Sequence, residues 1–173
     1  MDDSAAAAPG PRMWVPIVRG VAIALGLAVL YFLLPATTFP GGPTLVLVVG
    51  AVAFAAVLIW QLRAISRTHR PMTQGFETVV LLLAITVVTF AMTHLAHSIQ
   101  DPSAFNEPLT KVDSLYFTVT VVTTTGFGDI VPVAEYSRLA VTANMLTSVV
   151  LVAVVVRIVA RAISHAANER ARG

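Results

Sequence analysis

Apolar positions along the chain are gathered into four long runs, at residues 13–34, 44–62, 75–99 and 139–156. Each run is about 18 to 25 residues long, which at 1.5 Å per residue is enough for a helix to cross a hydrocarbon layer of about 30 Å. The last run is the uncharged part of a helix expected to begin near Val133. Residues 35–43, with prolines and paired glycines, predict a tight turn between the first two runs. The pattern therefore predicts an all-α membrane protein with four transmembrane helices.

A shorter apolar stretch at residues 115–122 departs from this pattern. Its sequence, Leu-Tyr-Phe-Thr-Val-Thr-Val-Val, alternates in part and is rich in β-branched and aromatic residues, which favours a strand. A single strand at membrane depth would leave its backbone N–H and C=O groups unpaired, whereas a short helix pairs them internally. We therefore expect a short re-entrant helix, with Asp113 or Ser114 as its N-cap.

Composition supports a membrane protein and excludes several other classes. Hydrophobic residues make up 57% of the 173 residues and charged residues only 12%, against about 25% charged in ordinary globular domains. The absence of cysteine excludes a disulfide framework, a thiolate zinc site and a cysteine nucleophile. The net charge of +2 is too small to suggest nucleic-acid binding. No catalytic triad, metal cluster or pair of membrane carboxylates is apparent, so neither enzyme activity nor a cofactor is expected.

Most basic residues fall on one side of the membrane if four helices cross it in turn. These residues are Arg12, Arg63, Arg67, Arg70, Arg157, Arg161, Arg170 and Arg172. Only Lys111 and Arg138 lie on the other side. Because cytoplasmic segments carry the excess of arginine and lysine, both termini are expected in the cytoplasm of a cell-membrane protein. Four parts are expected: a disordered N-terminus (1–12), two peripheral helices with a basic cytoplasmic loop (13–70), a module that holds the last two runs and the short stretch between them (71–165), and a short cytoplasmic tail (166–173).

One polar segment, Thr123-Thr124-Thr125-Gly126-Phe127-Gly128-Asp129, lies between the short apolar stretch and the last run. Two glycines at this spacing allow backbone angles with φ > 0 that other residues resist. A chain that alternates between right- and left-handed regions can point successive carbonyls the same way, and a ring of such carbonyls can replace the water shell of a small cation. This signature segment resembles that of potassium channels, whose usual form is Thr-Val-Gly-Tyr-Gly-Asp. The region around it resembles the pore domain of bacterial potassium channels with one pore loop per subunit.

The resemblance implies a role for each residue of the segment. Thr124 would contribute its hydroxyl and its carbonyl to the innermost K⁺ site, and Thr125, Gly126 and Phe127 would contribute carbonyls to the sites above it. Gly128 would shape the outer mouth. Because one chain supplies one segment and the ring needs four, the resemblance implies a homotetramer in the lipid bilayer, with K⁺ as the permeant ion on its axis.

Two residues of the segment depart from the usual signature. Phe127 replaces tyrosine and has no hydroxyl to donate to the re-entrant helix. The position that would normally receive that hydrogen bond holds Phe117, so an aromatic contact is expected in its place. Thr125 replaces valine, a swap of similar shape that adds a polar atom behind the segment.

The carboxylate that closes the segment is expected to have an unusual partner. Thr120 occupies a position where some bacterial channels carry a glutamate that pairs with the aspartate. Here no second carboxylate is present, so Asp129 is expected to bond Tyr116 and to support the segment through that bond.

The last helix carries candidates for a gate. Ser148 occupies the position of a glycine often described as a hinge in potassium channels, and a serine bends a helix only slightly by bonding back to a carbonyl. In a fourfold bundle one face could form a hydrophobic constriction; alternatively, it packs against the preceding membrane helix. That face carries Val149, Val152, Val156 and Ala160. Asn144 either lines the cavity or packs against a neighbouring helix.

Four further polar or charged residues lie within the apolar runs, outside the signature segment and the proposed gate. His94 and His97 share a helical face, a spacing that suits a metal ion or a pH sensor, although such pairs are more often solvated at the membrane interface. Arg19 is expected to extend its side chain to the interface. Glu77 is expected in the first turn of its helix, where the helix dipole favours a carboxylate.

Together these features predict a channel that conducts K⁺ passively. A voltage sensor needs arginines at every third position of a span, and only Arg19 lies within the first two runs. The expected gating is a voltage-independent leak controlled at the filter, with regulation by lipid, pH or an unknown partner through the first two helices as the next choice. A less selective cation channel is one alternative. A non-conducting scaffold or a small transporter is another, although the internal repeats of transporters are not found.

Overall fold

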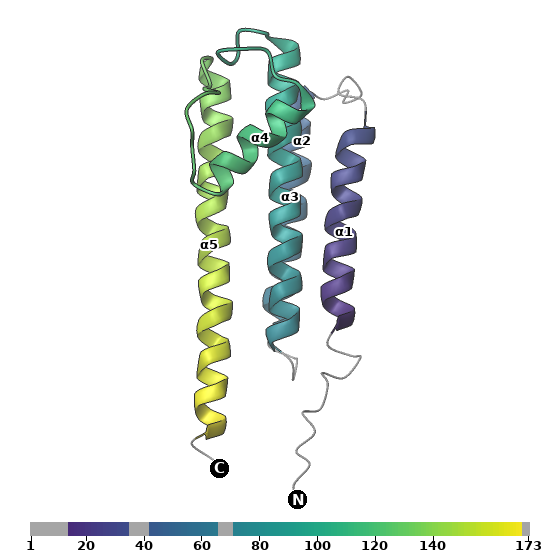
Figure 1. Ribbon diagram of the computed structural model, residues 1–173, viewed down its shortest axis with the longest axis vertical. Helices are drawn as coiled ribbons and strands as arrows, with labels where there is room; N and C mark the ends of the chain where they lie inside the picture. Colours follow the sequence, from purple (N-terminus) through teal and green to yellow (C-terminus); the bar gives the residue numbers. More distant parts are fainter. Residues whose placement is uncertain (1–13, 35–41, 66–70, 171–173) are drawn as a thin grey trace, which may run out of the picture.

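The computed structural model describes residues 14–34, 42–65 and 71–170, and the side chains of residues 18–34, 42–60 and 76–160. Within these residues the chain forms helices and no named strand. The helices are α1 (Trp14–Leu33), α2 (Gly42–Ile65), α3 (Pro71–Gln100), α4 (Lys111–Val122) and α5 (Glu135–Arg170). Four lie side by side along the long axis, and the short α4 crosses them obliquely near one end (Figure 1). The predicted disordered N-terminus, most of the tight turn and the chain's last residues lie outside the described residues.

Three of the described helices are long and apolar enough to cross a membrane. Their apolar spans are Gly42–Trp60, Phe76–Gln100 and Glu135–Ala160. The described apolar part of α1, Val18–Leu33, is shorter. Length and composition therefore confirm three of the four predicted spans, and α1 packs against α3 as the fourth long helix.

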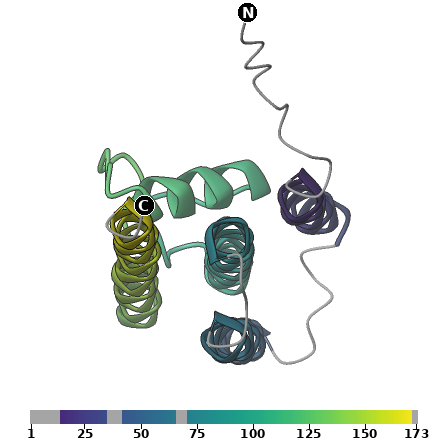
Figure 2. The ribbon, with the colours of Figure 1, turned by 90° about the horizontal axis from the view of Figure 1, so that it is seen from below.

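The central helix of the bundle is α3, which packs against each of the other four described helices (Figure 2). α2 comes closest to it at Gly50, where an added Cβ would collide with the Thr89 side chain. A glycine at this point lets the two backbones approach, as small residues do between membrane helices.

Arg19 and Glu77 form an ion pair that joins α1 to α3. The guanidinium Nε lies 2.7 Å from Oε1 and Nη2 lies 2.9 Å from Oε2, a bidentate arrangement. The Glu77 side chain is only 5% exposed, and that of Arg19 is 59% exposed. The expectation for Glu77 was wrong. Arg19 extends to a carboxylate, and because α3 begins at Pro71, Glu77 lies beyond the first turn and its unpaired N–H groups.

The stretch for which we expected a helix against its strand propensity is helical, as α4. Its N-cap is Thr110, which corrects the expected Asp113 or Ser114. The Thr110 hydroxyl accepts from the backbone N–H of Asp113, and the Asp113 carboxylate accepts from the backbone N–H of Thr110 at 2.9 Å. This is a capping box, in which the carboxylate sits at the third helical position, so the helix starts earlier than expected. The Thr110 hydroxyl and backbone N–H hold the pKa of Asp113 below its ordinary value.

Two apolar clusters hold α4 on opposite sides. The cluster nearer α5 contains Ala104, Phe105, Leu109, Phe117, Val121, Ile130 and Val141. The cluster nearer α1 contains Tyr31, Ala91, Met92 and Leu95, with Leu115 of α4 packed against it. The position of α4 therefore depends on α1 as well as on α3 and α5.

Candidate functional site

The signature segment follows α4 and returns to the end of the bundle at which α4 begins (Figure 1). Every second residue has a positive φ: 58° at Thr124, 52° at Gly126 and 79° at Gly128. Threonine is β-branched, and the left-handed conformation costs such a residue about 1–2 kcal/mol. Among the described residues no other non-glycine residue has a positive φ. Strain of this kind persists where the surrounding structure imposes it, and it clusters at functional sites.

The backbone N–H groups in the first part of the segment are bonded to the C-terminal end of α4. Thr125 and Gly126 donate to the carbonyl of Thr120 at 2.9 and 3.2 Å, and Thr124 donates to that of Val121 at 3.1 Å. No carbonyl of residues 124–128 accepts a hydrogen bond from the part of the chain that the structure describes. All five residues are exposed. The first three N–H groups of residues 124–128 are thus bonded within the chain, while the carbonyls of these five residues stay free.

Hydroxyl groups add a second connection between the segment and α4. The Thr123 hydroxyl donates to the carbonyl of Val119 at 2.8 Å and lies 2.9 Å from the Thr125 hydroxyl. A hydroxyl has one hydrogen, so when Thr123 donates to Val119 it accepts from Thr125. The polar atom that Thr125 brings in place of valine is therefore part of a chain of hydrogen bonds that ends on α4.

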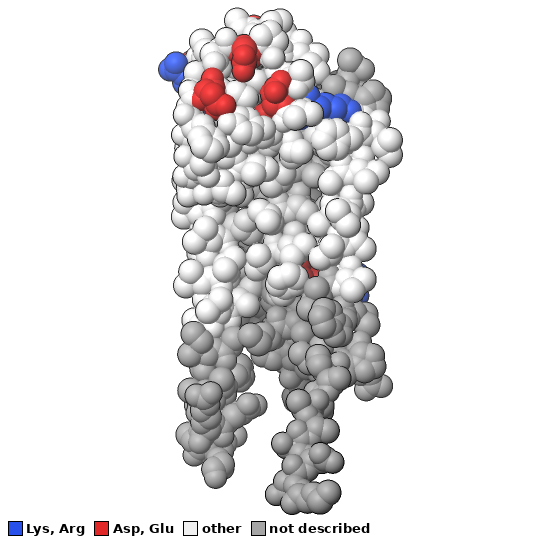
Figure 3. Space-filling view, viewed as in Figure 1, with Lys and Arg blue, Asp and Glu red and all other residues white. Residues whose placement is uncertain are grey.

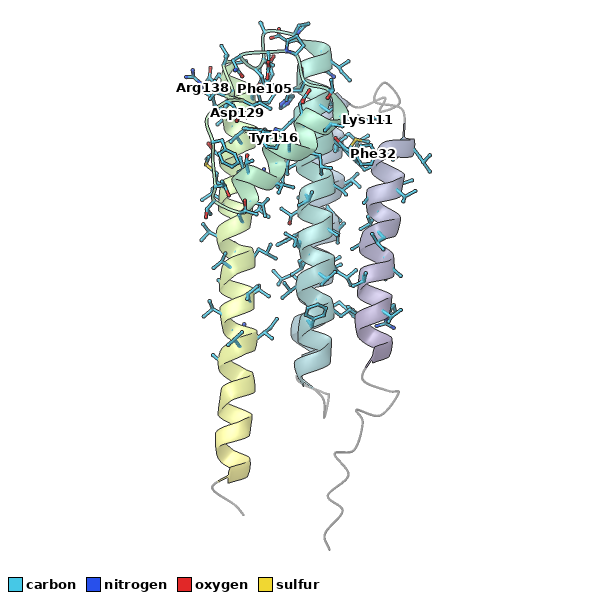
Figure 4. All side chains as sticks on the ribbon, viewed as in Figure 1. Phe32, Phe105, Lys111, Tyr116, Asp129 and Arg138 are labelled. Carbon is cyan, nitrogen blue, oxygen red and sulfur yellow. The ribbon has the colours of Figure 1, made fainter. Side chains whose placement is uncertain are left out.

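Tyr116 of α4 supports the far end of the segment, where it lies beside Asp129 (Figure 4). The Tyr116 hydroxyl donates to Oδ2 of Asp129 at 2.7 Å, so the expected hydrogen bond is present. This bond holds the pKa of the Asp129 carboxyl below its ordinary value and raises the pKa of Tyr116. The Tyr116 ring also stacks on Phe127, with centroids 6.2 Å apart and ring planes at 2°. One side chain of α4 thus contacts two residues of the segment.

The expected contact between Phe127 and Phe117 does not form within the chain. Phe117 is buried and packs edge-to-face against His94 and Phe105, with centroids 5.2 and 5.6 Å away. Phe127 is 68% exposed and has Tyr116 as its aromatic neighbour. The physical reason is the helical period: Phe117 lies on the face of α4 that enters the apolar cluster, and Tyr116 lies on the face that meets the segment.

Thr120 supports the segment through its backbone. Its side chain is buried, and its hydroxyl donates to the carbonyl of Phe117 within α4. Its carbonyl is the acceptor for the two N–H groups described above.

Asn106, which the sequence gave no reason to single out, clamps the chain directly after the segment. Its amide nitrogen donates to the carbonyl of Asp129 at 2.7 Å, and its amide oxygen accepts from the N–H of Val131 at 2.8 Å. The backbone adds a bond from the Asn106 N–H to the Val131 carbonyl at 3.1 Å. Nothing in the local sequence distinguishes Asn106 from its polar neighbours, because its partners lie about 25 residues away.

The histidine pair is buried, which corrects the expectation of a solvated interfacial pair. His94 is fully buried and packs against three phenylalanine rings, and its Nε2 lies 3.5 Å from the Asn144 amide nitrogen. His97 packs edge-to-face against Tyr136, with centroids 5.0 Å apart. Among the described residues no group of three His, Asp or Glu side chains could hold a metal ion. His94 thus packs against α4 through Phe117, and His97 packs against α5 through Tyr136.

The gate candidates on α5 separate into two faces. Asn144 and Ser148 are buried inside the protomer, where Asn144 packs against α3 and the Ser148 hydroxyl donates back to the Asn144 carbonyl at 2.9 Å. Asn144 therefore takes the packing alternative. Val149, Val152 and Val156 are 66%, 56% and 60% exposed, so their face does not pack against α3 of the same chain.

Acidic side chains gather at the end of the bundle that carries the segment (Figure 3). The described carboxylates in the loops and helix starts at this end are Asp101, Glu107, Asp113, Asp129 and Glu135. Two cations, Lys111 and Arg138, lie at the same end (Figure 4). Excess negative charge raises the local concentration of cations, an effect that salt screens.

These features define a class: a helical membrane protein in which a re-entrant helix leads into a strained segment with free carbonyls. A family model described as "Ion channel" matches residues 71–165, which is more than half of the chain. The chain therefore belongs to this ion-channel family.

One relative adds a second comparison. The chain is 29% identical over 91 residues to a Rhodopseudomonas palustris protein named "Putative potassium channel protein RPA4233". The match covers 53% of this chain and 21% of that relative. No solved structure matches the chain significantly.

Proposed function

We propose that the chain is one subunit of a homotetrameric, potassium-selective channel whose filter is formed by residues 124–128. The observation that carries this proposal is the backbone of the segment. Positive φ alternates along it even at a threonine, the N–H groups of Thr124, Thr125 and Gly126 are bonded to α4, and the carbonyls of residues 124–128 are free. Four such segments around an axis would replace the water shell of a cation. The name of the R. palustris relative supports K⁺ as that cation.

In this proposal each K⁺ is coordinated by oxygen atoms from four subunits. The hydroxyl and carbonyl of Thr124 form the innermost site, and the carbonyls of Thr125, Gly126 and Phe127 form the sites above it. Gly128, at φ 79°, turns the chain at the outer mouth. The acidic residues at the same end would draw cations toward that mouth.

The ion path continues along α5. Its exposed valines, Val149, Val152 and Val156, are apolar and lie at the level below the segment, so in a tetramer they would face the axis. A narrow ring of valines can close a pore by expelling water.

The charge distribution supports a cell-membrane channel that is not voltage-gated. If the four long helices cross the membrane in turn, the sequence puts most arginines on the side away from the filter, which favours cytoplasmic termini and an outward-facing filter. The arginine within α1, Arg19, is paired with Glu77 and is not one of a row of sensing charges.

Flux through reconstituted channels tests the proposal. The purified full chain is placed in liposomes with a K⁺ gradient, and K⁺ and Na⁺ fluxes are compared. We expect K⁺ to pass much faster than Na⁺, and Gly126→Ala to abolish the flux, because a Cβ is strained at φ 52°. The matched control is Gly26→Ala on α1, where a Cβ would meet nothing within 4 Å.

The outcomes separate the alternatives. Flux of both ions at equal rates would indicate a less selective cation channel. Absence of flux, or flux that Gly126→Ala leaves unchanged, would contradict the channel function.

A further inference from the structure

The first residue of α4 is bonded to the last turn of α1. The Lys111 ammonium donates to the carbonyls of Phe32 and Leu34, each at 2.7 Å. Lys111 and Phe32 lie together where the two helix ends meet (Figure 4). These residues are about 78 positions apart in sequence, so the contact belongs to the tertiary fold.

The chemistry of the contact fits the end of α1 and not the start of α4. The last carbonyls of a helix have no partners within it, and a cation is favoured at that negative end of the helix dipole. A lysine at the first position of α4 lies at the positive end of its own helix, where the dipole opposes a cation. The ammonium of Lys111 therefore serves α1, although its backbone begins α4.

A second hydrogen bond joins the same two helix ends, with the donor on α1 and the acceptor on α4. The Tyr31 hydroxyl donates to the carbonyl of Lys111 at 2.7 Å. The side chain is only 1% exposed and belongs to the cluster against which Leu115 of α4 packs. The hydrogen bonds of Lys111 and Tyr31 together are called the α1–α4 clamp below.

The two ends of α4 connect the clamp with the filter. α4 is one helix of 12 residues, about 18 Å long. Its first residue is held by α1, and the carbonyls of Thr120 and Val121 at its other end hold the N–H groups of the filter. α1 is itself fixed to α3 through Arg19 and Glu77, about 20 Å along α1 from the clamp. A displacement of α1 would therefore tilt α4 and change the support of the filter.

We propose that α1 positions the filter, and that Lys111 and Tyr31 are positioning residues that hold the start of α4 in place. The proposal rests on the proposed function and assigns a role to the first helix, which lies outside the matched pore module. Movement of α1 in the membrane would shift the filter between conducting and non-conducting arrangements.

The test removes the clamp from the full-length reconstituted protein. Lys111→Met keeps the length of the side chain and removes its donors, Tyr31→Phe removes one hydroxyl, and Lys111→Arg restores donors. Arg138→Met is the charge-matched control, since it removes one positive charge from the same end of the bundle. Two quantities are measured: hydrogen exchange of the Thr124–Gly126 amides, and the fraction of channels that conduct in a K⁺ gradient.

We expect Lys111→Met to speed exchange of these amides and to lower the ratio of conducting to non-conducting channels about tenfold, the size expected for lost hydrogen bonds to a charged group. Lys111→Arg should restore both quantities, and Tyr31→Phe should add little to Lys111→Met because the two residues act as a unit. Arg138→Met should leave the exchange unchanged.

Exchange that changes at the end of α1 but not in α4 or the filter would overturn the inference, as would additive effects of the two clamp variants. The exchange measurement does not need conduction. If the wild-type protein conducts no ions, the proposed function fails, while the mechanical link from α1 to the filter is still accepted or rejected by the amides.

Discussion

The Tyr116 hydroxyl and the Asp129 carboxylate meet at 2.7 Å, across 13 residues of sequence that include all five residues of the proposed filter. This hydrogen bond closes a loop of the chain that runs from Tyr116 of α4 through the proposed filter to Asp129. The loop is reinforced from outside by Asn106, which holds the carbonyl of Asp129.

Removing the tyrosine hydroxyl should weaken this loop without changing its shape. We expect Tyr116→Phe to keep the stack on Phe127 and to speed the loss of K⁺ conduction several-fold during sustained flux, because Asp129 loses its donor. Single-channel or flux recordings give the rate. If the rate and the K⁺/Na⁺ selectivity equal those of the wild type, Tyr116 does not support the filter.

Acidification should act on the same bond. The pKa of Asp129 lies below its ordinary value of 3.8, first because of the Tyr116 hydrogen bond. The stabilisation is therefore fully present above pH 3.8 and is lost as the pH falls through the lowered pKa. The raised pKa of Tyr116 sets a limit at high pH. The stabilisation from its hydrogen bond is present below pH 10.0 and is lost as the pH rises through the raised pKa of Tyr116.

We therefore expect the rate at which K⁺ conduction is lost during sustained flux to be constant from about pH 5 to 9. This rate should rise below the ordinary pKa of an aspartate carboxyl. Asp129→Asn should remove this rise at low pH. Asp101→Asn is the control, because the pKa of Asp101 is also lowered, but by Ser103 and Tyr136, away from the filter. If the rise at low pH persists in Asp129→Asn, another titrating group causes it.

The threonine hydroxyls behind the filter should be energetically coupled. Thr125→Val keeps the shape of the side chain and removes the donor to Thr123, whereas Thr123→Val also removes the donor to the Val119 carbonyl. A net hydrogen bond of about 0.5–1.5 kcal/mol corresponds to a change of about two- to tenfold in filter stability. We expect the larger effect for Thr123→Val, measured as amide exchange of the filter or as the rate of conduction loss.

The double variant decides whether the hydroxyls form one chain. Thr125→Val should add little once Thr123 is valine. Fully additive effects would show that the two hydroxyls act separately.

The Arg19–Glu77 pair should respond unequally to loss of its two partners. Arg19→Met leaves a buried carboxylate without its cation, whereas Glu77→Gln leaves an arginine that is already 59% exposed and can turn to water. We expect Arg19→Met to lower the free energy of unfolding by about 2 kcal/mol, less than for a fully buried pair because Arg19 is exposed, and Glu77→Gln to cost less. Thermal unfolding of the purified protein in detergent measures both. The reverse order would mean that the carboxylate is stabilised by other groups.

Much of the site could be predicted from the sequence because its chemistry is local. The apolar runs give the spanning helices, since a bilayer core requires about 20 consecutive apolar residues. The absence of water at membrane depth explains why residues 115–122 form a helix against their strand propensity. The spacing of Gly126 and Gly128 predicted positive φ at those positions, and the structure has it there.

Other features depended on which faces meet in three dimensions. Phe117 faces His94 and not Phe127, because neighbouring helical residues point about 100° apart and the buried face of α4 was unknown from one sequence. The left-handed Thr124 follows from hydrogen bonds on both sides of it, and threonine by itself opposes that conformation.

The sequence by itself determined the apolar helices and the signature segment between them, because these depend on composition and on spacings of a few residues. Only the tertiary structure decided which contacts hold the helices and this segment in place. Asn106 reaches Asp129, Arg19 reaches Glu77 and Lys111 reaches the end of α1 across 23 to 79 residues. Such pairs leave no periodic pattern in a single chain, since their partners are brought together only when the helices pack.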